Sequence, residues 1–478
     1  MRQSHLRAHR SVRRRVAGTW PSHPPQRRMK RILIYSHDTF GLGNIRRMLE
    51  VARHLVESSP RVSVLVITGS PMLHAFRIPP RIDYVKLPCL SRNTDGRYGA
   101  RSLTLGLDAT VRLRANMIKS VVADFTPDLI LVDKKPFGVE DELAGALEAL
   151  PCGAQRPRLV LLLRDILDDP AITRQVWRKN GCFEAISAYY HQVLVVGSPE
   201  VFDLRREYAF PPFAAAKVQF CGYIARQPGR QTAAAVRRQL GVPAQAPLVL
   251  VTPGGGEDGH QLIDTTLQAL ALLPPTACPR THIVCGPELD DQRRARVHLA
   301  AAALTNVSVQ DFSDDMMSLM GAADVVLAMG GYNTVCELLS LHKRALLVPR
   351  VRPGVEQLIR ARRMASLGLL RMIHPEQLTP QRLLDGLQAE LATLAERRPR
   401  PALRHHDGLA RVTAALFAAI GLQPGAAPAR QLADDTTHHL PDDMPDDLAG
   451  SGPMPLPPLA LEPAWHPRRL PLAARSAC

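Results

Sequence analysis

The sequence predicts an α/β protein whose two halves are each a doubly wound parallel sheet. Three observations support this fold class: short apolar runs alternate with segments of helical periodicity, glycine turns follow several of these runs, and a linker divides the chain. Hydrophobic residues make up 46% of the 478 residues and aromatic residues only 5%. The core therefore consists mainly of Leu, Val, Ala and Ile, a composition typical of helices packed on parallel sheets.

The first half begins with an apolar run of strand length, residues 31–36, which leads into a glycine loop. After this loop, apolar residues from Ile45 to Val56 recur at helical spacing with arginines between them. The same alternation continues, with predicted strands at 62–68, 83–88, 127–133, 159–163 and 193–197 and a predicted helix at 113–125. It predicts a parallel sheet, whose ligands bind beyond the carboxyl ends of the strands.

The boundary between the halves is predicted where Gly222 is followed by a stretch of linker composition, residues 227–230. We therefore expect a first domain at 29–225 and a second at 226–424, facing each other across a cleft that is the default place for a site. In the second half the predicted strands are 247–252, 281–286, 307–312, 324–329 and 344–349, and the predicted helices are one ending at Leu273 and those at 335–340, 380–394 and 408–420.

The two ends of the sequence differ in composition from the body. Residues 1–28 contain eight arginines and no acid, and we expect either a disordered basic arm or a true start of translation at Met29. Residues 425–478 are rich in Pro, Asp, Ala and His without periodicity. Such a segment has too little apolar surface to form a core, so we expect a disordered tail.

The formal net charge of +16 favours anionic partners, such as nucleotides or phospholipid head groups. No signature of a nucleic-acid-binding module accompanies the charge, so no specific nucleic-acid partner is expected. The eight cysteines form no CxxC pair and have no metal-ligand spacing, as in proteins of a reducing compartment. No apolar run is long enough to span a bilayer. We expect a cytoplasmic protein and leave open peripheral contact with the inner face of the membrane.

The stretch from 324 to 337 suggests a function most directly. An apolar strand leads through Gly330 and Gly331 into a helix, and this unit places free N–H groups and the positive end of a helix dipole where a phosphate can bind. Glu337 lies close to the start of the helix and can accept hydrogen bonds from two ribose hydroxyls. This stretch alone is equally consistent with an ordinary βαβ corner that contains a glycine turn.

The flanking residues resemble the C-terminal domain of GT-B glycosyltransferases of family 28, the type that adds N-acetylglucosamine to a lipid-linked peptidoglycan precursor. The likeness covers segments that follow one another in order over some 45 residues from Phe312. It implies a donor site in which Phe312 and its neighbour Ser313 contact the base, with Met316 in the same donor-binding segment. Gly330, Gly331, Thr334 and Glu337 would bind phosphate and ribose, and Glu356 and Gln357 would bind the donor sugar.

Two further features fit the same resemblance. Gly254, Gly255 and Gly256 form a second glycine turn, where the family has a loop near the diphosphate. Arg226 resembles a family arginine near the phosphates, although a solvated surface charge would look the same in the sequence. These residues complete the expected donor site. Because it contains helix N-termini and arginine rather than an Asp-x-Asp motif at a strand end, we expect neither a metal ion nor another cofactor.

The first half shows a weaker likeness to a bacterial group of predicted glycosyltransferases. Gly41, Gly43 and Asn44 resemble a Gly-x-Gly-His loop that faces the acceptor or a phosphate, with Asn44 in place of the family histidine. Asn cannot accept a proton from an acceptor hydroxyl, so the catalytic base must lie elsewhere. The sequence leaves four candidates for it, all at or just beyond strand ends: His37, Asp38, Asp133 and Asp165.

The resemblance implies a GT-B hexosyltransferase with two Rossmann-like domains. Its donor would be a nucleoside diphosphate sugar, with a UDP-sugar favoured, and its acceptor is unknown: a glycan, a lipid-linked molecule or a small molecule. Two alternatives stay open. A nucleotide-sugar 2-epimerase shares the fold and the nucleotide chemistry. The second alternative is a non-catalytic scaffold that binds nucleotide sugars. It is considered because Asn44 replaces the histidine that the family has in this loop.

Overall fold

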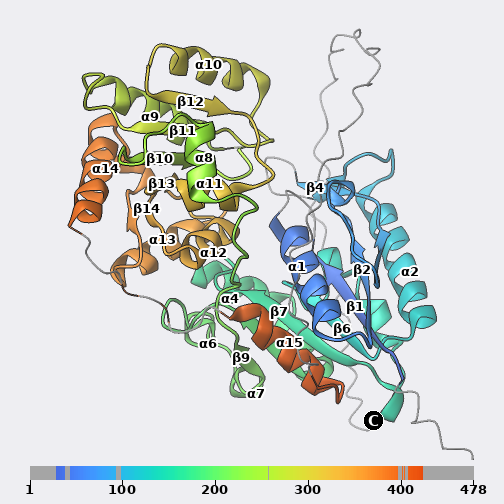
Figure 1. Cartoon of the computed structure of the whole chain (residues 1–478). Helices are drawn as coiled ribbons and strands as arrows, with labels where there is room; N and C mark the ends of the chain where they lie inside the picture. Colours follow the sequence, from blue (N-terminus) through green and yellow to red (C-terminus); the bar gives the residue numbers. More distant parts are fainter. Residues whose placement is uncertain are drawn as a thin grey trace, which may run out of the picture.

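The structure is a computed structural model that describes residues 28–37, 43–92, 98–256, 258–396, 401, 403 and 407–423. The predicted disordered tail and all but the last residue of the predicted basic arm lie outside these residues. Within them the chain forms two parallel α/β halves that lie side by side (Figure 1). The predicted fold class is confirmed.

The first half is built on a seven-stranded parallel sheet with the order β3-β2-β1-β6-β7-β8-β9. The strands are β1 (Lys30–Ser36), β2 (Val62–Thr68), β3 (Ile82–Lys86), β6 (Leu129–Asp133), β7 (Arg158–Arg164), β8 (Gln192–Val196) and β9 (Val218–Phe220). A small antiparallel hairpin of β4 (Leu90–Arg92) and β5 (Tyr98–Ala100) stands apart from this sheet. The helices are α1 (Gly43–Ser58), α2 (Leu107–Phe125), α3 (Ala144–Glu148), α4 (Pro170–Lys179), α5 (Cys182–Tyr189), α6 (Leu204–Glu207) and α7 (Pro212–Ala215).

The second half contains a six-stranded parallel sheet with the order β12-β11-β10-β13-β14-β15. Its strands are β10 (Leu248–Thr252), β11 (Arg280–Val284), β12 (Val307–Gln310), β13 (Val325–Ala328), β14 (Arg344–Leu347) and β15 (Arg371–Met372). Its helices are α8 (Ala233–Gln239), α9 (His260–Ala271), α10 (Asp291–Ala302), α11 (Met316–Ala322), α12 (Tyr332–Ser340), α13 (Glu356–Ser366) and α14 (Pro380–Ala395).

Both sheets form from apolar runs that are buried on both faces. In β7 the five residues from Leu159 to Leu163 are all 0% exposed, and β10 and β13 are buried throughout. Such continuous apolar strands are typical of parallel sheets covered by helices. In each sheet the strand order reverses at one point, between β1 and β6 in the first half and between β10 and β13 in the second. Ligands of doubly wound sheets bind at these reversals.

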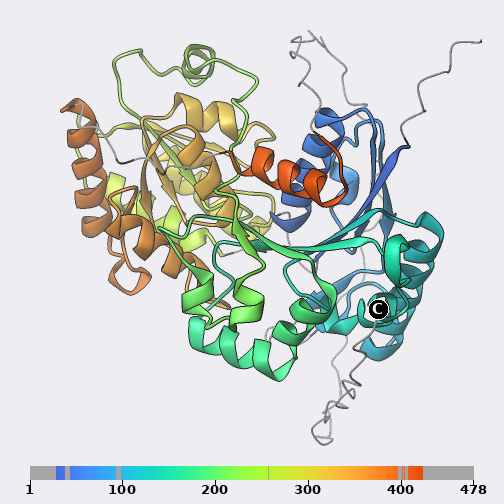
Figure 2. The same ribbon diagram turned by 90° about the horizontal axis from the view of Figure 1, so that it is seen from below.

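The last described helix, α15 (Gly408–Ala419), differs from the expectation that residues 408–420 complete the second half. It packs on the first half, where Thr413 Oγ1 lies 2.7 Å from His54 Nδ1 of α1. The Gly408 N–H donates to the Tyr223 carbonyl at 3.1 Å. Figure 2 shows α15 beside α1. Its apolar face, which includes Phe417, belongs to the core of the first half, so its amphipathic pattern did not reveal which sheet it would cover.

The sheet of the second half contains a buried histidine that makes stability depend on pH. His282 of β11 is 4% exposed, with Nδ1 2.8 Å from Ser308 Oγ and Nε2 3.2 Å from Gln310 Oε1. Burial lowers the pKa of this imidazole, and the bond to Gln310 offsets only part of the effect. The unfolded chain, with a histidine pKa of about 6.5, therefore binds the proton more readily. The contribution of His282 to the free energy of unfolding is therefore complete above pH 6.5. It is lost as the pH falls through the lowered pKa of the folded state.

We therefore expect His282→Gln to reduce the loss of stability between pH 7 and pH 5. The measurement is the urea midpoint of unfolding at several pH values, with His298→Gln as the control. His298 is a half-exposed histidine paired with Asp311 at 2.8 Å. Parallel pH profiles of His282→Gln and the unchanged protein would contradict the prediction.

Candidate functional site

The strand, glycine turn and helix predicted at 324–337 are present as β13 and α12. Gly330 has φ +89°, a left-handed conformation that favours glycine, and Gly331 is the N-cap of α12. The helix begins at Tyr332, three residues earlier than predicted, so Thr334 lies in its first turn. The first N–H groups of a helix lack intrahelical acceptors and stand at the positive end of its dipole. An anion can therefore bind beside this turn, with the buried Glu337 (3% exposed) close by.

The second glycine turn lies next to the first, because β10 and β13 are neighbours at the reversal of strand order. Gly254 and Gly256 have φ values of +86° and +100°, which glycine adopts at little cost. A Cβ built on Gly254 would lie 4.0 Å from Thr334 Oγ1. Gly254 and Gly255 are exposed. The turn at Gly254–Gly256 and the start of α12 therefore form one surface.

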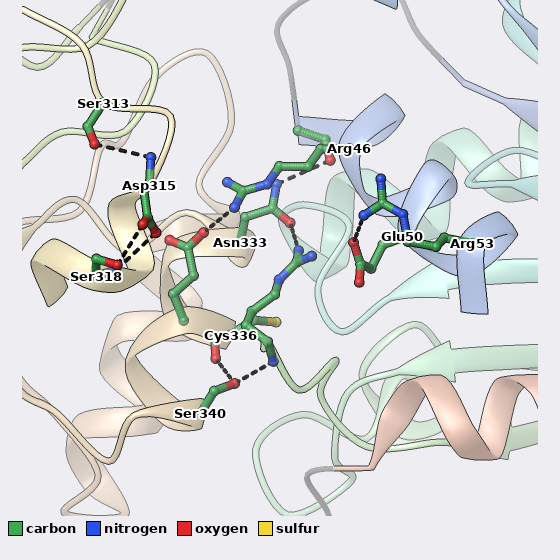
Figure 3. Close-up of polar contacts among 12 residues, drawn as sticks. Arg46, Glu50, Arg53, Ser313, Asp315, Ser318, Asn333, Cys336 and Ser340 are labelled. Atoms are coloured by element: carbon green, nitrogen blue, oxygen red, sulfur yellow. Dashed lines mark hydrogen bonds and ion pairs between the residues drawn. The ribbon is translucent and has the colours of Figure 1, made fainter. Parts of the chain in front are cut away.

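The predicted base-binding segment follows β12, at the outer edge of the same sheet. Phe312 is 52% exposed, which leaves its ring available for stacking. Ser313 Oγ accepts a hydrogen bond from the Asp315 N–H at 3.2 Å, and Asp315 in turn accepts from the Ser318 N–H at 3.2 Å (Figure 3). Asp315 thereby caps α11, which begins at the half-buried Met316. These bonds fix the segment in place.

Gln357, at the start of α13, contacts the glycine turn after β13. The residue is 8% exposed. In the orientation that satisfies both ends of its amide, nitrogen donates to the Met329 carbonyl at 2.9 Å and oxygen accepts from Arg350 Nε at 3.1 Å. A Cβ on Gly331 would lie 3.9 Å from this amide. The structure thus brings Gln357 to the helix start that carries Glu337.

Glu356 lies among arginines from both halves. It is 7% exposed and forms an ion pair with Arg350 at 3.2 Å. Burial alone would raise the pKa of the Glu356 carboxyl, but the positive charges of Arg164, Arg350 and Arg360 together hold it below its usual value. Glu356 is therefore ionised at neutral pH. The Glu356 carboxylate forms an ion pair with arginine, whereas the neighbouring Gln357 carries a neutral amide.

Arg226, in the connection between the halves, lies along α12. Its Nη2 donates to Asn333 Oδ1 at 2.9 Å and its N–H donates to Ser340 Oγ at 2.9 Å, so both contacts are with this helix. Its buried Nε has no hydrogen-bond partner among the described residues. The predicted phosphate arginine therefore lies next to the predicted phosphate turn.

The glycine loop of the first half lies across from α12. Gly43 is the first residue of α1 and is exposed, and Asn44 Nδ2 donates to the His37 carbonyl at 2.7 Å. His37 follows β1 and is 1% exposed. Two predicted residues of this region, Asp38 and Gly41, lie outside the described residues. Asn44 thus links the start of α1 to the end of β1.

The two remaining base candidates are fully buried and paired with arginine. Asp133 accepts a hydrogen bond from Arg47 at 2.6 Å. Asp165 accepts two from Arg360, at 2.7 and 2.8 Å, and one from the Tyr223 hydroxyl at 2.9 Å. Both carboxylates are 0% exposed. With no exposed surface and with arginine in contact, neither carboxylate faces an incoming acceptor hydroxyl. These contacts favour structural roles for Asp133 and Asp165 over the predicted role as base.

Two contacts across the halves were not foreseen in the sequence. Arg46 of α1 forms an ion pair with Glu337 Oε1 at 2.9 Å, although the atoms are not aligned for a hydrogen bond. Asn333 Nδ2 donates to the Gly43 carbonyl at 3.2 Å, so Asn333 bridges Arg226 and the start of α1 (Figure 3). The only hint in the sequence was that Arg46 and Asn333 stand beside motif residues.

Among the residues that the structure describes, neither a candidate metal site nor a membrane-spanning helix is found. In the part of the chain that it describes, no group of three or more His, Cys, Asp or Glu side chains is placed to hold a metal ion. Among the same residues, every helix is too short or too polar to cross a bilayer.

Comparison with known proteins places the second half in a family. Residues 248–406 match the glycosyltransferase family 28 C-terminal domain. A UDP-N-acetylglucosamine--N-acetylmuramyl-(pentapeptide) pyrophosphoryl-undecaprenol N-acetylglucosamine transferase of Methylobacterium sp. (strain 4-46) is 33% identical over 146 residues, which are 30% of this chain and 39% of that protein. An uncharacterized glycosyltransferase of Methanopyrus kandleri is 27% identical over 154 residues, 32% of this chain and 41% of that one. The chain thus spans about two fifths of the length of these relatives.

Solved structures match a larger share of the chain at low identity. The glycotransferase of kitacinnamycin has a TM-score of 0.54 at 16% identity and covers 82% of this chain and 100% of its own. MurG of Acinetobacter baumannii has a TM-score of 0.53 at 15% identity, over 81% and 99%. A UDP-GlcNAc 2-epimerase of Neisseria meningitidis has a TM-score of 0.52 at 13% identity, over 82% and 100%. These likenesses establish the fold. The chain therefore has the GT-B fold, and its second half carries a glycosyltransferase family 28 C-terminal domain.

Proposed function

We propose that the protein is a glycosyltransferase that moves a hexose-type sugar from a nucleoside diphosphate sugar to an acceptor. The observation that carries this proposal is the pair of glycine turns, Gly254–Gly256 and Gly330–Gly331, at adjacent strand ends with the buried Glu337 beside them. A UDP-sugar is the favoured donor, because the curated relatives of the second half include enzymes named for UDP-N-acetylglucosamine.

The geometry supports a donor site on the second half. The diphosphate binds at the start of α12 beside Arg226, where N–H groups and a guanidinium stabilise the charge that develops on the leaving group without a metal ion. The ribose hydroxyls donate to Glu337, and the base stacks on the exposed ring of Phe312. The sugar lies toward Gln357. Each of these roles is a proposal for the residue named.

The reaction is a displacement at the anomeric carbon of the sugar. The acceptor oxygen forms the new bond as the bond to the β-phosphate oxygen breaks, and the acceptor proton passes to a base. Since Asp133 and Asp165 are buried in ion pairs, His37 and Asp38 remain the candidates for this base. The acceptor, whether a glycan, a lipid-linked molecule or a small molecule, enters from the side of the first half.

A thermal-shift screen against UDP-, GDP-, ADP- and dTDP-sugars tests the proposal. A ligand that binds the folded state at 100 times its Kd adds about 2.7 kcal/mol of stability, so we expect a UDP-sugar to raise the Tm by several degrees. If no nucleotide sugar changes the Tm, the proposal is wrong. Incubating the bound sugar nucleotide without acceptor then separates the alternatives: a 2-epimerase converts the sugar, whereas a scaffold or a transferase without acceptor leaves it unchanged.

A further inference from the structure

Arg46 connects the two halves at the residue that the proposed donor needs. It projects from the first turn of α1, and its guanidinium lies 2.9 Å from Glu337 Oε1 in α12. The Glu337 side chain is 4% exposed, whereas that of Arg46 is 40% exposed. Figure 3 shows Arg46 extending from α1 toward α12, next to Asn333. A cation of the first half thus covers a buried carboxylate of the second.

This contact and a bound ribose compete for the same carboxylate. The Glu337 side chain is 4% exposed, so the guanidinium 2.9 Å from Oε1 covers the approach by which a ribose hydroxyl would reach that oxygen. Among the described residues, Glu337 is the sole polar partner of Arg46. Arg46 can therefore leave Glu337 without breaking any other contact that the structure shows.

Once separated from Glu337, the Arg46 guanidinium would be attracted to an anion at the start of α12. The proposed diphosphate binds at the start of α12, about one and a half helical turns before Glu337. Asn333, in the first turn, contacts α1 through the Gly43 carbonyl at 3.2 Å. A phosphate oxygen attracts a guanidinium through charge-assisted hydrogen bonds. Since α1 already touches the first turn of α12 at Gly43, an anion bound there would lie beside the helix from which Arg46 projects.

We propose that Arg46 is a donor-binding residue contributed by the first half. In the structure it pairs with Glu337, and it exchanges that carboxylate for the donor diphosphate when the ribose hydroxyls bind Glu337. This inference rests on the proposed function, because it requires a nucleoside diphosphate at α12. It adds two points to the proposed function. The first half takes part in donor binding, and the Arg46–Glu337 ion pair competes with the ribose for Glu337.

Titration calorimetry of uridine and UDP with Arg46→Ala separates the two parts of the exchange. Uridine competes with Arg46 for Glu337 but offers it no phosphate, so its affinity is expected to rise about threefold, the scale of a half-exposed ion pair. UDP offers the diphosphate as well, so its affinity is expected to fall about tenfold. Arg46→Lys, which restores the charge, is expected to recover most of the affinity for UDP.

Arg53→Ala is the matched control. Arg53 lies on the same helix, is 38% exposed and pairs with Glu50 at 3.4 Å, away from α12 (Figure 3). Both affinities of this variant are expected to equal those of the unchanged protein. Its thermal unfolding and that of Arg46→Ala should coincide, which shows that both proteins are folded.

Each other outcome overturns the exchange in a distinct way. If Arg46→Ala changes neither affinity, or weakens both to the same degree, Arg46 has no separate contact with the diphosphate. If it strengthens both, Arg46 is a competitor only. If the unchanged protein binds no UDP, the proposed donor is wrong and the exchange with it. Binding of UDP by the unchanged protein together with equal affinities in Arg46→Ala would overturn this inference alone.

Discussion

Replacing Arg360 with methionine is expected to lower the free energy of unfolding by about 3–5 kcal/mol, the cost of leaving a buried charge without its partner. Arg360 donates two hydrogen bonds to Asp165 of the first half, and a third to the Gly330 carbonyl at 3.1 Å. Both charged side chains are 0% exposed. Methionine would leave the Asp165 carboxylate buried without its counter-charge. Urea-induced unfolding followed by circular dichroism measures the difference.

Two further variants make this prediction specific. Arg363 lies on the same helix, α13, and pairs with Glu207 at 2.7 Å, but it is 48% exposed. Exposed pairs contribute about 0–1 kcal/mol, so Arg363→Met is expected to have a small effect. The double variant Arg360→Met with Asp165→Leu removes both charges and is expected to be more stable than Arg360→Met alone. If Arg360→Met costs no more than Arg363→Met, the buried pair contributes little and the prediction is wrong.

Glu337→Ala is expected to weaken the binding of UDP about 100-fold or more. Each hydrogen bond to a charged group contributes about 1.5–3 kcal/mol, and the ribose would lose two of them. The residue is 3% exposed and its ion-pair partner is Arg46, so alanine also removes this pair and the packing of the side chain. Titration calorimetry with UDP measures the change. Glu337→Gln, which keeps the size of the side chain, is expected to lose less affinity than Glu337→Ala.

The control for this prediction is Glu50→Ala. Glu50 is an acid of the same type in an ion pair with an arginine of α1, but its partner, Arg53, lies away from the glycine turns. Its removal is expected to leave UDP affinity unchanged. An affinity for UDP that is the same in Glu337→Ala and in Glu50→Ala would show that Glu337 does not hold the ribose, whatever the nucleotide contacts elsewhere.

Most strands of the two sheets could be predicted because they are apolar runs, whereas the short edge strands β9 and β15 were not predicted. The run at 62–68 coincides with β2, and the predicted run at 344–349 extends only two residues past β14. Several helices were missed because they are short in apolar residues. Helix α10 buries only Val297 and Ala301, and the buried face of the Arg-rich α13 includes Glu356, Gln357 and Arg360, so neither helix shows a clear apolar stripe in the sequence. Tertiary contacts, rather than local pattern, stabilise such helices.

The donor side of the site could be predicted because its residues are close in the sequence. Gly330, Gly331 and Glu337 lie within one strand–turn–helix unit. The contact of Asn333 with Gly43 joins residues 290 positions apart and depends on how the two halves meet, which no local pattern records. For the same reason Asp165 looked like an accessible acid at a strand end. Its arginine partner lies in the other half of the chain.

The position of α15 changes how the two halves can move. Because this helix returns to α1 after α14 has completed the second sheet, the second half is an insertion within the first, and the backbone crosses between them twice. Two backbone connections restrict how far one half can turn relative to the other more than a single linker would. A protein truncated after α14 would keep the second sheet intact and lose a core helix of the first.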